Sequence, residues 1–225
     1  MLVLVRVALD DRPGELARAA AAIAEAGGNI LAMDVVERDN TKVFDDFVVE
    51  LGDAGPAVVA EFLSSVPDMV VDCVRMTSES GLHREIELLS ALVANRRPSL
   101  DLLARLVPAI VHCDWAIVIS SLGPAVVVTH TSASGPRIRW SDLPWLPISV
   151  PRSLDPDADW VPDSWHSLRL SLAAAPVDVD TAILVCRTAG PSFRSSELDR
   201  LGQLGWLAGG LLQTALGSGS LSTVA

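Results

Sequence analysis

The fold of the first third of the chain is decided by residues 2–37, which read LVLVRVALDDRPGELARAAAAIAEAGGNILAMDVVE. Residues 2–9 are mainly valine and leucine, which is typical of a buried β-strand. Residues 15–26 are rich in alanine, and their apolar side chains recur every three to four positions, which predicts a helix. The glycine pair at 27–28 suits the left-handed conformation that ends a helix. Since residues 29–37 are again apolar, the stretch predicts a strand, a helix and a second strand.

The following residues continue this pattern. We expect residues 42–51 to run back against residues 29–37 as a hairpin, because polar turn residues separate the two apolar runs. A short helix and a fourth strand then complete a βαββαβ order, the split β-α-β arrangement of ferredoxin-like domains, at residues 57–65 and 69–76. Small and polar residues at 77–81 are typical of a linker. Residues 1–76 are therefore expected to form one domain.

The second part of the chain predicts another α+β domain, at residues 82–216, followed by a flexible tail at 217–225. Apolar residues recur at helical spacing in three segments, which are 82–93, 99–110 and 197–216. Four runs typical of strands lie between these helices, at residues 114–121, 124–131, 168–174 and 180–187. Residues 132–167 lack periodicity and are rich in tryptophan, and so long an irregular stretch is usually a functional loop region. Its tryptophans either line an apolar pocket or order the segment by packing, and we favour packing.

Composition and charge exclude several classes of protein. Hydrophobic residues make up 50% of the 225 residues, which excludes intrinsic disorder. The formal net charge of −11 comes from 17 basic and 28 acidic residues and argues against a nucleic-acid partner and an anionic membrane surface. We find no signal-peptide pattern and no apolar run of the roughly 18 residues that a membrane span needs. The three cysteines are widely spaced among apolar residues, as buried thiols in a reducing compartment are, so we expect a cytoplasmic protein.

Two motifs carry a resemblance to a known family. Asp11-Arg12-Pro13-Gly14-Glu15-Leu16 follows the first predicted strand, and Gly28-Asn29-Ile30 opens the second. With this spacing across one helix, residues 2–76 resemble the ACT domain, a small amino-acid-sensing module of metabolic regulation. The resemblance implies a homodimer in which two copies pair side by side and bind an amino acid in the cleft between them. It also implies that the ligand is held by residues of both motifs, which are Asp11, Arg12, Pro13, Gly14, Glu15, Leu16, Asn29 and Ile30.

The chemistry of these residues agrees with an amino-acid site. A free amino acid needs one group for its carboxylate and another for its ammonium. The backbone N–H groups of residues 14–16 begin a predicted helix, where an anion binds favourably. The Asp11 carboxylate suits the ammonium group, and the Asn29 amide offers both a donor and an acceptor. The structural alternative is that Asp11 caps the helix, Pro13-Gly14 shapes the turn, and Asn29 only follows a glycine cap.

A second, more distant resemblance concerns residues 82–216. Residues 182–187 are followed by Gly190-Pro191-Ser192-Phe193 and then by Glu197-Leu198. This succession resembles the last strand, the turn and the helix start that close a GAF domain, a sensor fold with a central antiparallel sheet flanked by helices. The middle of the segment matches no ligand signature, so the resemblance implies a fold without naming a ligand.

Motifs of metal sites and of catalysis are missing from the sequence. The four histidines are scattered, and there is no C-x-x-C, H-E-x-x-H, G-x-S-x-G or phosphate-binding loop. We therefore expect no metal, no cofactor and no enzyme activity. The expected function is that of a regulatory protein whose ACT-like domain binds a free amino acid and whose GAF-like domain is a second sensor or a relay. The alternative is an interaction protein whose degenerate sensor domains bind a partner polypeptide.

Overall fold

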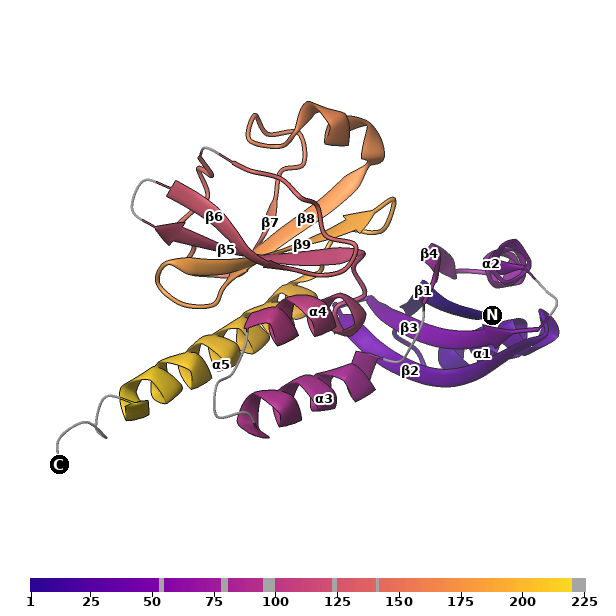
Figure 1. Cartoon of the computed structure of the whole chain (residues 1–225). Helices are drawn as coiled ribbons and strands as arrows, with labels where there is room; N and C mark the ends of the chain where they lie inside the picture. Colours follow the sequence, from indigo (N-terminus) through magenta and orange to yellow (C-terminus); the bar gives the residue numbers. More distant parts are fainter. Residues whose placement is uncertain (53–54, 78–80, 95–99, 123–124, 141, 220–225) are drawn as a thin grey trace. The chain divides into compact units, whose positions relative to one another are not determined.

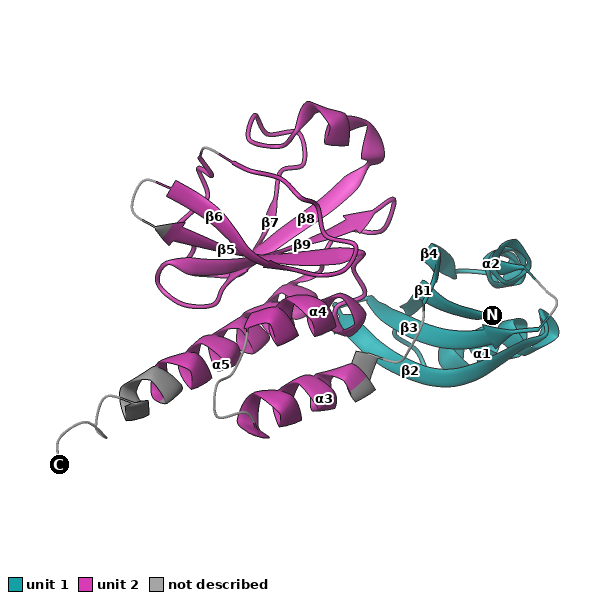
Figure 2. Cartoon of the chain, viewed as in Figure 1, with its two compact units in different colours: residues 1–80 teal, residues 81–225 magenta. Residues whose placement is uncertain are grey.

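The computed structural model describes residues 1–52, 55–77, 81–94, 100–122, 125–140 and 142–219. The chain divides into two compact units, Met1–Ser80 and Gly81–Ala225, which Figure 2 shows in different colours. Within the described ranges, no helix is both long enough and apolar enough to cross a membrane. Residues 78–80 of the predicted linker and residues 220–225 of the predicted tail lie outside the described residues.

Unit 1, residues 1–80, contains a four-stranded antiparallel sheet and two helices (Figure 1). Its elements follow the predicted βαββαβ order and are β1 (Leu2–Asp10), α1 (Glu15–Glu25), β2 (Gly28–Arg38), β3 (Lys42–Leu51), α2 (Pro56–Ser65) and β4 (Val70–Met76). The strands lie in the order β2-β3-β1-β4, with β2 and β4 at the edges. The predicted ferredoxin-like arrangement is therefore confirmed.

The two faces of the unit 1 sheet differ because side chains alternate along each strand. One face packs against both helices. Alternate residues of β1 and β3 supply the strand side of this core, and apolar residues of α1 and α2 supply the helix side. The core includes Val3, Val5 and Val7 of β1, Phe47 and Val49 of β3, Ala19 and Ile23 of α1, and Val59 and Leu63 of α2. On the opposite face the Arg6 guanidinium forms a buried ion pair with the Asp46 carboxylate, with Nε 2.7 Å from Oδ1. These two residues are also direct partners in the β1–β3 register.

Unit 2, residues 81–225, has a five-stranded antiparallel sheet in the order β6-β5-β9-β8-β7. Its elements are α3 (Gly81–Ala94), α4 (Leu100–Ile110), β5 (Trp115–Leu122), β6 (Ala125–Thr131), β7 (Arg152–Leu154), the 3₁₀ helix η1 (Asp163–Leu168), β8 (Leu170–Pro176), β9 (Thr181–Thr188) and α5 (Ser195–Gly219). One sheet face packs against α4 and α5, and α3 packs against these two helices. The other face packs with the tryptophan-rich segment. This arrangement confirms the predicted α+β class.

The segment at residues 132–167 is more ordered than its sequence predicts. It contains β7, which pairs with β8 at the edge of the sheet, and the start of η1. Its tryptophans contact one another and the sheet, as in the pair Trp115 and Trp165, whose ring centroids are 5.3 Å apart. The Trp140 indole also donates a hydrogen bond of 3.1 Å to the Trp160 carbonyl oxygen. The tryptophans therefore order the segment by packing, as we favoured.

Helix α5 packs closely on its own unit through a row of glycines. A Cβ atom added at Gly209 would lie 1.9 Å from the Val177 carbonyl oxygen, and one added at Gly205 would lie 2.3 Å from the Pro176 carbonyl oxygen. Only glycine permits the backbone of α5 to approach the end of β8 so closely. The helix extends to Gly219, three residues beyond its predicted end at residue 216. Glycine lowers helix propensity by about 1 kcal/mol relative to alanine but does not break a helix as proline does.

Candidate ligand-binding site

The turn between β1 and α1 holds most of the first sequence motif. Gly14 is the N-cap of α1 and has φ 96°, a left-handed conformation that favours glycine. Among the described residues, no side chain forms a capping hydrogen bond to α1, so none of them occupies the first amides of this helix. The alternative in which Asp11 caps the helix is therefore wrong. Pro13 precedes the N-cap and shapes the turn together with Gly14, as the structural alternative expected.

Asp11 pairs with an arginine from the far end of β2. Its carboxylate receives two hydrogen bonds from Arg38, from Nε at 2.6 Å and from Nη2 at 2.7 Å. The Asp11 backbone N–H donates to the Thr41 carbonyl oxygen at 3.0 Å, which fixes the residue against the β2–β3 turn. The hydrogen bond and the charge of Asp11 raise the pKa of the Arg38 guanidinium above its ordinary value. The pair stands at the protein surface, where Arg38 is 67% exposed.

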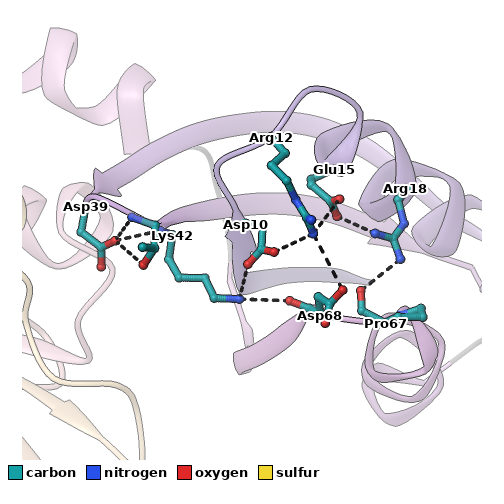
Figure 3. A network of polar contacts seen from close by, with 9 residues as sticks. Asp10, Arg12, Glu15, Arg18, Asp39, Lys42, Pro67 and Asp68 are labelled. Atoms are coloured by element: carbon teal, nitrogen blue, oxygen red, sulfur yellow. Dashed lines mark hydrogen bonds and ion pairs between the residues drawn. The ribbon is translucent and has the colours of Figure 1, made fainter.

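The neighbouring residues Arg12 and Glu15 belong to a network of ion pairs, which Figure 3 shows. Arg12 contacts Asp10 at 2.6 Å and Glu15 at 3.6 Å, and it also approaches Asp68 at 3.8 Å. Lys42 contacts the other oxygen of Asp10 at 2.7 Å. The hydrogen bond from Lys42 lowers the pKa of the Asp10 carboxyl below its usual value. The network links the β1–α1 turn to the start of β3 and to the α2–β4 turn.

A pocket of about 220 Å³ opens between this turn, the first turn of α1 and the sheet. Charged residues and apolar side chains line it in similar numbers, namely Asp10, Asp11, Arg12, Glu15, Arg38 and Asp45, and Leu9, Leu16, Met33, Val35 and Val43. Of the eight residues predicted to hold a ligand, the pocket brings together Asp11, Arg12, Glu15 and Leu16. Pro13 and Gly14 lie in the adjoining turn.

Asn29 and Ile30 lie at the opposite end of the sheet. Asn29 is in register with Glu50, whereas Arg38 at the other end of β2 is in register with Val43. Nine positions therefore separate Asn29 from Arg38, which corresponds to about 30 Å at the rise of a β-strand. Ile30 packs on the helix-covered core. Within one chain, the two sequence motifs thus do not meet.

Seven of the lining residues were not among the predicted site residues, and two of these bear directly on ligand binding. One is Arg38, and the other is Asp45, which is only 4% exposed. Oδ1 of Asp45 is buried and has no hydrogen-bond partner within the part of the chain that the structure describes. Desolvation raises the pKa of the Asp45 carboxyl, and the charges of Asp46 and Asp34 raise it further. The sequence did contain a signal, because two consecutive aspartates inside an apolar strand must face opposite sides of the sheet, so one of them reaches the helix-covered face.

Comparison with known proteins identifies the first unit. Residues 3–68 match the family model of the ACT domain. These residues form an ACT domain. The pocket therefore lies in the ACT domain, at the end of its first strand and the start of its first helix. No curated protein matches the chain.

Solved structures similar to this chain contain GAF domains. One is the GAF domain of a phosphoenolpyruvate-protein phosphotransferase from Coxiella burnetii, at 11% identity and a TM-score of 0.50, with coverage of 63% of this chain and 98% of that one. Another, from Pseudomonas syringae pv. tomato, is the GAF domain of a protein described as a sensor histidine kinase, at 14% identity, a TM-score of 0.44, and coverage of 63% and 90%. The first likeness supports the fold alone, which is the predicted GAF-like sheet outside the ACT domain.

Proposed function

We propose that this protein is a non-catalytic regulator whose ACT domain binds a free amino acid in the pocket beside the β1–α1 turn. The observation that carries this proposal is the Asp11–Arg38 ion pair at the pocket, with hydrogen bonds of 2.6 and 2.7 Å. An amino acid is itself a zwitterion. Inserted between these residues, it would present its ammonium group to Asp11 and its carboxylate to the planar guanidinium of Arg38, which binds carboxylates in bidentate fashion.

The start of α1 supports the same arrangement. Its first amides have no side-chain cap, and the partial positive charge of a helix N-terminus favours a carboxylate. When a zwitterion inserts between Asp11 and Arg38, each of these side chains exchanges its partner for an opposite charge of the ligand. The net charge of the pocket therefore stays the same. The volume of about 220 Å³ lies below the roughly 300–1,000 Å³ of pockets for drug-sized ligands, as befits a single amino acid.

A homodimer would bring the second sequence motif to this pocket. Strand β2 is an edge strand whose exposed apolar side chains include Leu31, Met33 and Val35, and an exposed edge of this kind favours pairing with another chain. Antiparallel pairing of two β2 strands about a two-fold axis near Met33 would place Asn29 of the second copy opposite Glu37. Asn29 would then lie beside Arg38. Within one chain Asn29 lies about 30 Å from Arg38. In the proposed dimer, the Asn29 of one copy would instead contribute to the pocket of the other copy.

The GAF-like unit is proposed to act as a second sensor or as a relay of the ACT signal. A regulatory rather than catalytic role is supported by the ACT match and the GAF-like fold of the rest of the chain.

A thermal-shift screen of the twenty amino acids on the full chain tests the ligand. At a ligand concentration of 100 times Kd, binding to the folded state stabilises it by about 2.7 kcal/mol. We expect at least one amino acid to raise the Tm of the ACT transition by several degrees, and Arg38→Ala to abolish that rise. A flat screen would overturn the proposal and favour binding of a partner polypeptide.

Light scattering tests the dimer separately. We expect about 48 kDa at micromolar concentration, twice the chain mass of 23.8 kDa. Leu31→Lys places a charge on the exposed face of β2 outside the pocket lining and should shift the mass toward that of one chain. A parent protein that measures one chain mass at this concentration would contradict the dimer.

A further inference from the structure

Asp45 is an unusual residue to find in the lining of this pocket. It belongs to the middle of β3, in register with Val7 on one side and Val35 on the other. Val7 is part of the core that both helices cover, so Asp45 faces the helices and the pocket. The side chain is 4% exposed, and Oδ1 has no partner. A buried carboxylate oxygen without a partner is destabilising, so its presence needs an explanation.

The charges around the pocket are unbalanced. Four acidic residues line it, Asp10, Asp11, Glu15 and Asp45, against the two basic residues Arg12 and Arg38. Ion pairs within the chain already compensate most of these charges, since Asp11 contacts Arg38, and Asp10 and Glu15 contact Arg12. The negative charge that remains without a cationic contact is that of Asp45.

The uncharged part of the pocket lining is apolar. Leu9 of β1, Leu16 of α1, and Met33, Val35 and Val43 of the neighbouring strands line the pocket together with Asp45. A ligand whose backbone groups meet Asp11 and Arg38 therefore has apolar side chains and one further carboxylate within the same pocket. A chain of methylene groups that ends in a cation matches both features, because the methylenes contact the walls and the cation meets the carboxylate.

We propose that the pocket selects an amino acid with a cationic side chain, whose ammonium or guanidinium group donates a hydrogen bond to Asp45. This inference rests on the proposed amino-acid site and names its ligand class. Asp45 is thereby the residue that determines specificity, while Asp11 and Arg38 bind the groups that all amino acids share. An acidic side chain is rejected, because it would bring a second carboxylate against Asp45. A neutral aliphatic side chain fits the walls but leaves Asp45 unpartnered.

Calorimetry on the full chain with matched ligands tests this selection. L-lysine and L-norleucine share the same aliphatic stem, and only lysine carries the terminal ammonium group; L-arginine and L-glutamate complete the set. We expect lysine or arginine to bind at least about tenfold more tightly than norleucine, since an unpaired buried charge weakens binding strongly. Glutamate should show no binding. This comparison needs no variant and so does not depend on how a substitution folds.

The substitution Asp45→Asn then tests whether Asp45 is the residue that selects a cationic side chain. The variant should lose at least about tenfold in affinity for the cationic ligand and keep its affinity for norleucine within about threefold. Asp72→Asn removes an equal charge from an exposed position of β4 outside the pocket and should change neither value. If a neutral or acidic amino acid binds more tightly than lysine and arginine, the inference is wrong while the amino-acid site stands. If none of the twenty amino acids binds, the proposed function itself fails.

Discussion

The substitution Asp45→Asn should stabilise the ACT domain, although it removes a residue that we place at the binding site. In the absence of ligand, Asp45 buries a carboxylate oxygen that has no hydrogen-bond partner. Asparagine keeps the size and shape of the side chain but never carries a charge. The variant therefore loses the desolvation penalty of a carboxylate while the packing around β3 stays the same.

The size of this gain follows from the burial and from the missing hydrogen bond. An unsatisfied buried polar group costs about 1–3 kcal/mol. Since the asparagine amide remains polar and buried, we expect a gain near the lower end, about 1 kcal/mol in the free energy of unfolding. For a domain of this size, 1 kcal/mol corresponds to a Tm increase of roughly 4–8 °C.

The gain should depend on pH in a defined direction. Burial and the charges of Asp46 and Asp34 raise the pKa of the Asp45 carboxyl in the folded protein above the usual 3.8. The folded state then holds this proton more tightly than the unfolded chain does. The stability that Asp45 contributes is complete below pH 3.8 and is lost as the pH rises through the raised folded pKa. The advantage of Asp45→Asn is therefore smallest below pH 3.8 and grows as the pH rises.

Hydrogen exchange measured by mass spectrometry on peptides of β3 reports this difference within the full chain. Slower exchange in Asp45→Asn than in the parent at pH 7.5, after correction for the intrinsic rates, is the expected result. Asp72→Asn, with its exposed side chain, serves as the charge-matched control and should leave exchange in β3 unchanged. Faster exchange in Asp45→Asn at pH 7.5, or an equal gain at pH 4, would refute the reasoning.

Three further substitutions separate packing from binding. Gly209→Ala should lower the stability of unit 2 by about 1–3 kcal/mol in urea unfolding, because the added Cβ would meet the Val177 carbonyl oxygen. Gly210→Ala places its Cβ in open space and should stabilise the helix by roughly 0.5–1 kcal/mol, so equal effects of the two substitutions would contradict the close packing of α5. Asp11→Asn should weaken amino-acid binding at least about tenfold in calorimetry and leave the circular dichroism spectrum unchanged, since Asp11 does not cap α1; unchanged affinity would remove Asp11 from the site.

The order of strands and helices could be predicted from the sequence because it depends on local signals. Alanine-rich apolar periodicity marked α1, and glycine and proline marked its ends, without information from elsewhere in the chain. Strand β7 could not be found in this way. It has only three residues, and its strand conformation depends on pairing with β8, which lies some twenty residues further along the chain.

The candidate site was predictable only in part for the same reason. The β1–α1 turn has a local motif, so Asp11 could be named from the sequence. Arg38 meets Asp11 because strand pairing aligns the ends of β1, β3 and β2, and no local pattern contains that alignment. The burial of Asp45 depends on the helices that cover its side of the sheet. The expected joint action of Asp11 and Asn29 requires a second copy of the chain.

The tryptophans of unit 2 also give the protein an intrinsic fluorescence signal that is specific to this unit. All six tryptophans follow residue 81, and the chain has no tyrosine, so the ACT domain contains neither of the two strongly fluorescent side chains. Emission excited at the indole band therefore originates in the GAF-like unit alone. An amino acid that binds beside Asp11 can change this emission only by altering unit 2, so a simple fluorescence titration measures directly whether the two units communicate.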